Sequence, residues 1–246
     1  MANDVLRRAL SDARLTERQL AQRVGVDPAT VSRWVADEHR MPQARLWWRV
    51  AEQLGCEEVE LWPRAARAAV KMGWDREVQA VYPTRAAMPR DVRQRMVAGA
   101  GREVMAALYT AYSLWSDIPG LSDLLRAKAG AGCRVRFVLG DPDAELTHLT
   151  EQAESTPLTV GARIGHALHE LEPLRDVVEV RQSVLGWGKS VLRCDGEAVL
   201  AFAVLGQMGA QSPHLHLVRR LSGGLFDQMA VAHTEALWEA ARPVWP

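Results

Sequence analysis

The spacing of apolar residues divides the chain into a helical N-terminal part and a C-terminal part that mixes helices with strands. The first apolar stripe has the i, i+3, i+4 and i+7 spacing of an amphipathic helix and consists of Leu6, Ala9, Leu10 and Ala13. A later stripe with the same periodicity follows Pro42 and consists of Trp47, Val50, Ala51 and Leu54. We therefore expect a small helical bundle over the first sixty or so residues.

Two closely spaced helices are predicted between these stripes. Thr16 can cap the first of them, and Gln19 completes a capping box with it. Gly25 can adopt the left-handed conformation that ends a helix. Asp27 and Pro28 then suit the cap and the first position of the next helix. The chain thus predicts a helix, a tight turn and a second helix between residues 16 and 36.

The second helix of this pair has one apolar and one polar face. Val31, Trp34 and Val35 share the side expected to face the core. The opposite side carries small and hydroxylated residues and one arginine, namely Ala29, Thr30, Ser32 and Arg33. Small residues allow close approach to DNA, while hydroxyls and an Arg can bond to base edges or phosphates in the major groove.

The run from Leu15 to Trp34 resembles the Xre (Cro/repressor-like) helix-turn-helix family, and the later segments 51–55 and 61–63 are also similar to it. The resemblance implies double-stranded DNA as a partner. It implies DNA contacts by Thr16, Arg18, Gln19, Asp27, Ala29, Thr30, Ser32, Arg33 and Arg40. One residue departs from the family: Glu17 stands where such proteins often have Gln, and a carboxylate there would repel a phosphate. Arg18 beside it is the expected substitute for that contact.

Basic residues are concentrated after the bundle. From Arg64 to Arg95 there are eight Lys or Arg and three acids, and Pro83 and Pro89 interrupt the segment. A helix is expected after Pro89. The segment could follow DNA phosphates beside the recognition helix, but a solvated linker is the more common use of such a charge run.

The C-terminal part predicts an α/β domain with a mixed sheet. The segment 103–109 is expected to be a buried strand, although its Ala and Met content would also suit a helix. With a helix after Pro119 and a β-branched strand at 134–139 it forms a strand–helix–strand unit, which implies parallel pairing. A helix is expected around 161–171 and a last one at 226–241. Further strands are expected around 177–184, 190–194, 198–204 and 214–218.

The segments 121–142 and 188–196 resemble the phospholipase D-like superfamily fold. Active members carry His-x-Lys-x-x-x-x-Asp, in which the His is the nucleophile. Here Trp187 stands in the position of the His relative to Lys189, and Asp195 is displaced by one residue. Without an imidazole the chemistry lacks its nucleophile, so we expect no catalytic residues and no cofactor.

Histidine and tryptophan residues offer weaker alternatives. His166 with His169, and His214 with His216, could each place two imidazoles on one face, yet no acid or Cys spacing completes a metal motif, so no metal site is expected. Three tryptophans of this part, Trp115, Trp187 and Trp238, are expected to pack in the core. Alternatively, they could line a small-molecule cavity or a dimer interface.

Charge and cysteine usage refine the assignment. The 30 basic residues balance the 30 acidic ones, but from Met1 to Arg49 there are nine Arg and six acids. The three cysteines form no CxxC pair, and no run of about 20 apolar residues is present, so a cytoplasmic protein without a membrane segment is expected.

Together these patterns predict an α+β protein of three parts: a helix-turn-helix domain at 1–63, a basic linker with a helix at 64–98, and a phospholipase D-like α/β domain at 99–246. The expected function is sequence-specific DNA binding by a homodimeric transcriptional regulator. Its C-terminal domain would dimerise and sense an unidentified small-molecule or protein effector. Two alternatives stay open: a phosphodiesterase or nuclease brought to DNA by the same module, and an adaptor that uses the bundle to hold another protein.

Overall fold

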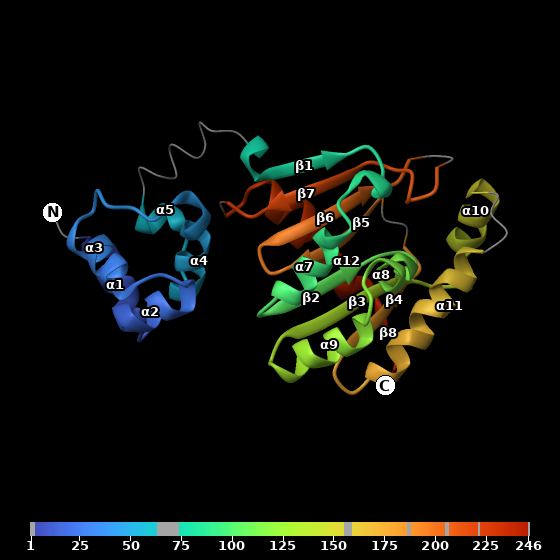
Figure 1. Ribbon diagram of the computed structural model, residues 1–246, viewed down its shortest axis with the longest axis horizontal. Coiled ribbons are helices and arrows are strands. Elements are labelled where there is room, and N and C mark those ends of the chain that lie inside the picture. Colours follow the sequence, from blue (N-terminus) through green and yellow to red (C-terminus); the bar gives the residue numbers. More distant parts are fainter. Residues whose placement is uncertain are drawn as a thin grey trace. The chain divides into compact units, whose positions relative to one another are not determined.

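The computed structural model describes residues 3–62, 74–154, 159–185, 188–204, 207–220 and 222–245. The chain forms two compact units: Met1–Glu77 with Arg219–Asp227, and Val78–Val218 with Gln228–Pro246. Figure 1 shows the helices of the first unit and the sheet of the second. The predicted α+β class is confirmed, with an all-α N-terminal part and a mixed sheet after it. No helix in the described ranges has the length and apolar character needed to cross a membrane.

The two helices predicted between residues 16 and 36 begin at the caps predicted for them, and the first of them ends at Gly25. The bounds of the N-terminal helices are α1 Asp4–Asp12, α2 Glu17–Val24, α3 Pro28–Ala36, α4 Ala44–Leu54 and α5 Glu58–Leu61. Gly25 and Gly55 end α2 and α4 in the left-handed region, at φ 76° and 67°. This conformation favours glycine because it has no Cβ.

One apolar core holds these helices together. Leu6, Leu20 and Val31 have no exposed surface, and Trp34 and Trp47 close the core around them. The indole N–H of Trp47 donates to the carbonyl of Pro42 at 2.7 Å, so its polar atom is satisfied inside the core. The predicted inward face of α3, Val31 with Trp34 and Val35, is confirmed.

The described strands of the second unit form one mixed sheet in the order β1-β7-β6-β5-β2-β3-β4-β8. β2, β3 and β4 are parallel and the other neighbours are antiparallel, which confirms the predicted parallel pairing of 103–107 with 134–138. The strand bounds are β1 Val78–Tyr82, β2 Glu103–Ala107, β3 Arg134–Gly140, β4 Glu179–Ser183, β5 Lys189–Cys194, β6 Glu197–Phe202, β7 His214–Val218 and β8 Arg242–Pro243.

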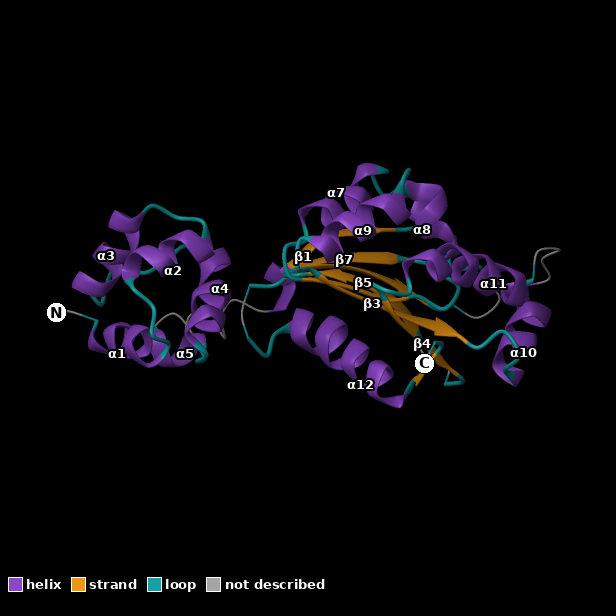
Figure 2. Cartoon of the chain, turned by 90° about the horizontal axis from the view of Figure 1, so that it is seen from below, coloured by secondary structure: helices purple, strands orange, loops and turns teal. Residues whose placement is uncertain are grey.

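Helices cover both faces of this sheet (Figure 2). One face packs against α7 Asp91–Gly99, α8 Tyr112–Asp117, α9 Leu121–Gly130 and α11 Val160–Leu171 around a core that includes Phe137 and Leu125. α10 Glu145–Glu154 contacts α11. On the other face, α12 His233–Ala240 packs through Leu237 and Trp238 against Met105. A π-helix, Asp227–Ala232, precedes α12.

A buried ionic cluster lies between the sheet and α12. Arg136 of β3 and Arg193 of β5 both pair with Glu103 of β2 and Glu235 of α12. Three of the ion-pair distances are 2.7 Å for Arg136–Glu235, 2.7 Å for Arg193–Glu103 and 2.6 Å for Arg193–Glu235. The Arg136 side chain is only 4% exposed, and its guanidinium lies 5.0 Å from the Trp238 ring. The two arginines and two glutamates balance in charge, which is the condition for burying ions at an acceptable free energy.

Several elements differ from the sequence prediction. β1 lies within the segment expected to be a linker at 64–98, and it pairs with β7 at the sheet edge. Residues 64–73 of that segment lie outside the described residues. The helix expected after Pro89 is present as α7, whereas α8 and α10 were not expected. The single helix predicted at 226–241 is divided into the π-helix and α12.

Candidate nucleic-acid interface

The α2 and α3 pair is built by capping interactions. The backbone N–H of Gln19 donates to the Thr16 hydroxyl at 3.2 Å, and the Thr16 N–H donates to the Gln19 side-chain oxygen at 2.9 Å. The N–H of Ala29 donates to the Asp27 carboxylate at 2.8 Å. Three of the expected DNA-binding residues, Thr16, Gln19 and Asp27, thus satisfy helix N-termini in the structure. The contacts that the resemblance implies for them remain predictions.

The polar face of α3 is open to solvent. Ala29, Ser32 and Arg33 are exposed and Thr30 is partly exposed, as predicted. The Arg33 guanidinium donates to the carbonyl of Ala29 at 3.1 Å and to the hydroxyl of Thr30 at 3.0 Å. Arg33 therefore lies along its own helix and keeps its positive charge, since both of these partners are neutral.

One hydrogen bond joins α2 to the polar face of α3. The Ser32 hydroxyl donates to the carboxylate of Glu17, the first residue of α2. It also lies 3.3 Å from the carbonyl of Pro28. Glu17 is thus beside the residues expected to read DNA, and the described residues provide it with a hydroxyl partner and no basic one.

The remaining expected contacts lie at the surface. Arg18 follows Glu17 at the start of α2 and is exposed. Arg40 is also exposed and follows α3, where its guanidinium lies 3.7 Å from the Asp37 carboxylate. An exposed ion pair of this kind contributes little free energy, so Arg40 can exchange Asp37 for a phosphate at small cost.

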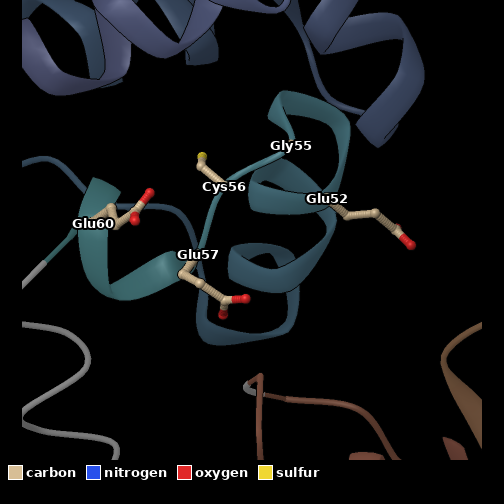
Figure 3. Close-up of a pocket in the computed structure, with 5 residues that line it drawn as sticks. All are labelled: Glu52, Gly55, Cys56, Glu57 and Glu60. Carbon is tan, nitrogen blue, oxygen red and sulfur yellow. The ribbon is translucent and has the colours of Figure 1, made fainter.

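A shallow depression with a volume of about 280 Å³ lies on α4 and α5. Glu52, Glu57 and Glu60 surround the Gly55–Cys56 turn there (Figure 3). Burial, together with the nearby carboxylates, raises the pKa of the Cys56 thiol to about 11, so the thiol is protonated at neutral pH. Three carboxylates would repel a phosphate, so this part of the bundle is unsuited to contact DNA.

Asp195, the acid closest to the phospholipase D-like motif, has a structural role. It lies in the β5–β6 turn at φ 50°, and its carboxylate accepts three backbone N–H groups, from Gly101 at 2.8 Å, Arg102 at 3.1 Å and Glu103 at 2.9 Å. The side chain thus anchors the start of β2. Trp187 lies outside the described residues, and burial lowers the pKa of Lys189.

The histidines considered as metal ligands lie in separate environments. His214 is buried between the Ser212 carbonyl at 2.9 Å and the Arg93 guanidinium at 3.4 Å, and burial lowers its pKa. Its neutral ring donates from Nδ1 and accepts at Nε2, so neither nitrogen is available to a metal. His216 pairs with Glu197 at 2.7 Å, and His166 packs against the Tyr112 ring. In the described ranges no three His, Cys, Asp or Glu side chains are grouped to hold a metal ion.

Sequence reasoning missed two features near the candidate sites. The Glu17–Ser32 bond joins residues 15 positions apart on different helices. The ionic cluster joins four separate elements. The sequence did contain one indication of this cluster, because charged residues such as Arg136 lie inside strands that are otherwise apolar. Trp238, suggested as a cavity or dimer residue, belongs to α12 and is buried against the sheet, and Trp115 packs against the core on the other face.

Comparison with known proteins supports the N-terminal assignment. The family model described as helix-turn-helix matches residues 6–61. No curated protein matches the sequence.

Two solved structures show limited similarity. TrmBL2, an archaeal chromatin protein whose structure shows a novel mode of DNA binding, has 14% identity and a TM-score of 0.42 over 89% of this chain and 72% of its own. The phospholipase D family member Nuc from Salmonella typhimurium has 13% identity and a TM-score of 0.38 over 68% of this chain and 96% of its own. These scores are too low to carry an argument about fold or function.

The family match covers the residues whose caps, turn and exposed polar face are described above. Residues 6–61 therefore form a helix-turn-helix domain.

Proposed function

We propose that this protein is a cytoplasmic, sequence-specific DNA-binding transcriptional regulator that acts as a homodimer, with a C-terminal unit for dimerisation and effector sensing. The observation that carries the proposal is the exposed polar face of α3, held by α2 within a helix-turn-helix domain. The face carries hydroxyls and a guanidinium that can bond to base edges. It lacks the aromatic and Met side chains that mark the centre of a protein interface.

DNA is supported over a protein partner by the way the charges are arranged. Arg18, Arg33 and Arg40 are exposed at the start of α2, on α3 and just after α3. The acidic residues Glu52, Glu57 and Glu60 lie instead on or beside α4 and α5. A phosphate backbone approaching α2 and α3 can therefore bond to Arg18, Arg33 and Arg40, although the acids Glu17, Asp27 and Asp37 lie among them.

The proposal is tested by fluorescence anisotropy with the full chain, DNA from its own upstream region and a scrambled duplex, at two salt concentrations. Tighter, salt-dependent binding to the upstream DNA is expected. Weak and equal binding to both duplexes, together with specific capture of a protein through α3, would favour the adaptor alternative.

The short stretch of DNA that one helix-turn-helix domain can contact supports a homodimer. A single recognition helix covers one half-site, and two copies of the chain would present two helices about 34 Å apart to a palindromic site. The second unit also exposes apolar side chains, with Val81, Val184 and Leu185 exposed by 65%, 58% and 51%. Sedimentation equilibrium should give a mass twice that of the chain. A monomer both free and on DNA would contradict this part of the proposal.

We also propose that the C-terminal unit does not hydrolyse phosphodiesters. The support is Asp195, whose carboxylate is committed to three backbone N–H groups rather than to a general acid or base role. The control residue is Lys128 of α9, whose ammonium donates to the Ala100 carbonyl away from the motif. Hydrolysis of bis(p-nitrophenyl) phosphate by the purified chain, lost in Lys189→Ala and kept in Lys128→Ala, would instead establish the phosphodiesterase alternative.

A further inference from the structure

The hydrogen bond between Ser32 and Glu17 changes what this part of the surface can recognise. A serine hydroxyl normally donates one hydrogen bond and accepts others. Here the proton of Ser32 is directed to the Glu17 carboxylate, so the oxygen keeps only its accepting lone pairs. An ionised carboxylate also accepts and cannot donate. The pair is therefore a set of acceptors at the exposed side of α3.

Acceptors discriminate among the groups that DNA presents. Phosphate oxygens, guanine O6 and N7, and thymine O4 are themselves acceptors and gain nothing from this pair. The exocyclic amino groups of cytosine N4 and adenine N6 are donors in the major groove. An acceptor pair formed by Ser32 of α3 and Glu17 of α2 thus favours one of these two amino groups and disfavours phosphate.

The charge of Glu17 adds a second effect. The described residues give its carboxylate a neutral hydroxyl as a partner and no basic one. Its negative charge is therefore not neutralised by an ion pair within the described residues, and the exposed Arg18 follows it in the chain. Any duplex that approaches α3 must bring its phosphates close to this charge, whatever its sequence.

We propose that Glu17 is a specificity-determining residue: together with Ser32 it selects a cytosine or adenine amino group and weakens binding to non-specific DNA. This inference rests on the proposed function. It assigns Glu17 a role distinct from a phosphate contact, since the carboxylate repels the phosphate and bonds to the serine of the reading helix instead.

Glu17 also lies in the first turn of α2, where an acid stabilises a helix. A purely structural role would therefore alter stability without altering base preference. The experiment must separate these two roles, and the chain offers a matched control in Glu60, an exposed acid in the first turn of α5.

The first measurement uses the full chain as wild type, Glu17→Gln and Glu60→Gln, with a scrambled duplex followed by anisotropy at about 50 and 200 mM salt. Glu17→Gln should tighten binding roughly threefold at the lower salt, as expected for removing one partly screened charge near a phosphate. The effect should shrink at the higher salt, and Glu60→Gln should change binding by less than half as much. Equal changes in the two variants would overturn the electrostatic part of the inference.

The second measurement selects bound sequences from a duplex pool with a randomised centre, using wild type, Glu17→Gln and Ser32→Ala. Both variants should relax the preference at the same base-pair position, where wild type enriches cytosine or adenine on one strand. Thermal melting by circular dichroism shows whether each variant is folded.

The outcomes separate this inference from the proposed function. Wild-type enrichment that is unchanged in Glu17→Gln overturns this inference and leaves the proposed function intact. A pool from which the wild type enriches no sequence overturns both. Relaxation at different positions in the two variants shows that Glu17 and Ser32 do not act as a pair and also overturns the inference.

Discussion

Arginine side chains have opposite surroundings in the two units. Arg18 and Arg33 of the helix-turn-helix domain are exposed, and Arg33 bonds to neutral oxygens of its own helix. In the sheet unit, Arg136 and Arg193 are buried and pair with Glu103 and Glu235. The first pair keeps its charge available to a polyanion, whereas the second is neutralised within the fold.

This difference explains why the net charge of the whole chain is a poor indicator of DNA binding. The cluster contributes two positive and two negative charges that pair with one another, and its two guanidinium groups are buried against the sheet. Only exposed and uncompensated charges attract DNA at a distance. The following predictions test this division, from the largest expected effect to the smallest.

The largest effect is expected for Arg136→Met, which breaks the buried cluster and leaves Glu103 and Glu235 sharing one arginine. The free energy of unfolding of the sheet unit should fall by about 3–5 kcal/mol, the usual cost of leaving a buried charge without its partner. Urea denaturation of the full chain, with hydrogen exchange at the β2 and β3 amides, measures this. Arg134→Met is the control, because its pair with Glu179 is exposed and should cost at most about 1 kcal/mol. Similar losses in both variants would contradict the division.

Arg33→Ala should weaken binding to the specific site by about 1–3 kcal/mol if the guanidinium reads a base. Binding to scrambled DNA should change little, and the unfolding free energy should stay nearly constant because Arg33 is exposed. Anisotropy on both duplexes measures the difference. An equal loss on the two duplexes would show a phosphate contact instead.

Thr16→Ala should lower the stability of the N-terminal unit by about 1 kcal/mol, since it removes the cap of α2. Thr16→Ser keeps a hydroxyl and should retain most of that stability. Hydrogen exchange of α2 amides reports the loss locally. If Thr16 also contacts DNA, Thr16→Ala will weaken binding even at temperatures where the unit stays fully folded.

The smallest effect is expected on the stability of the fold at acidic pH. Burial alone would raise the pKa of Glu235, but hydrogen bonds and charge from Arg136 and Arg193 outweigh burial and lower it below its ordinary value of 4.5. A carboxyl with a lowered folded-state pKa stabilises the fold above its unfolded pKa, and this contribution disappears as the pH falls through the folded-state value. Stability should therefore decline below about pH 4.5, and Glu235→Gln should make the decline shallower. Urea midpoints measured between about pH 6 and 3 test this; identical slopes in wild type and variant would contradict it.

The first unit could be predicted from sequence because its signals are local. Thr16 with Gln19, Gly25, and Asp27 with Pro28 each act within four residues, and each has the predicted role in the structure. The inward face of α3 followed from helical periodicity alone. The hydrogen bond from Ser32 to Glu17 could not be predicted, because it depends on the angle between two helices.

The sheet unit was predicted less completely because its pairings are distant in sequence. β7 was predicted at its observed bounds, but its neighbour β1 was not recognised, since Val78–Tyr82 is short and lies among prolines and arginines. Its strand conformation depends on β7, more than 130 residues away. Arg136 and Glu235 of the ionic cluster are 99 residues apart in the sequence, so no local sequence pattern indicates that they pair.

The acceptor pair of Glu17 and Ser32 also has a consequence for the speed of target search. Differences in affinity among related complexes arise mostly in the dissociation rate. A carboxylate at Glu17 would therefore shorten each visit to a wrong site, and its long-range effect on the rate of encounter would be reduced by screening at physiological salt. Such a protein would test more DNA sites per unit time than the Glu17→Gln variant. A smaller fraction of its molecules would be bound to non-specific DNA at any moment.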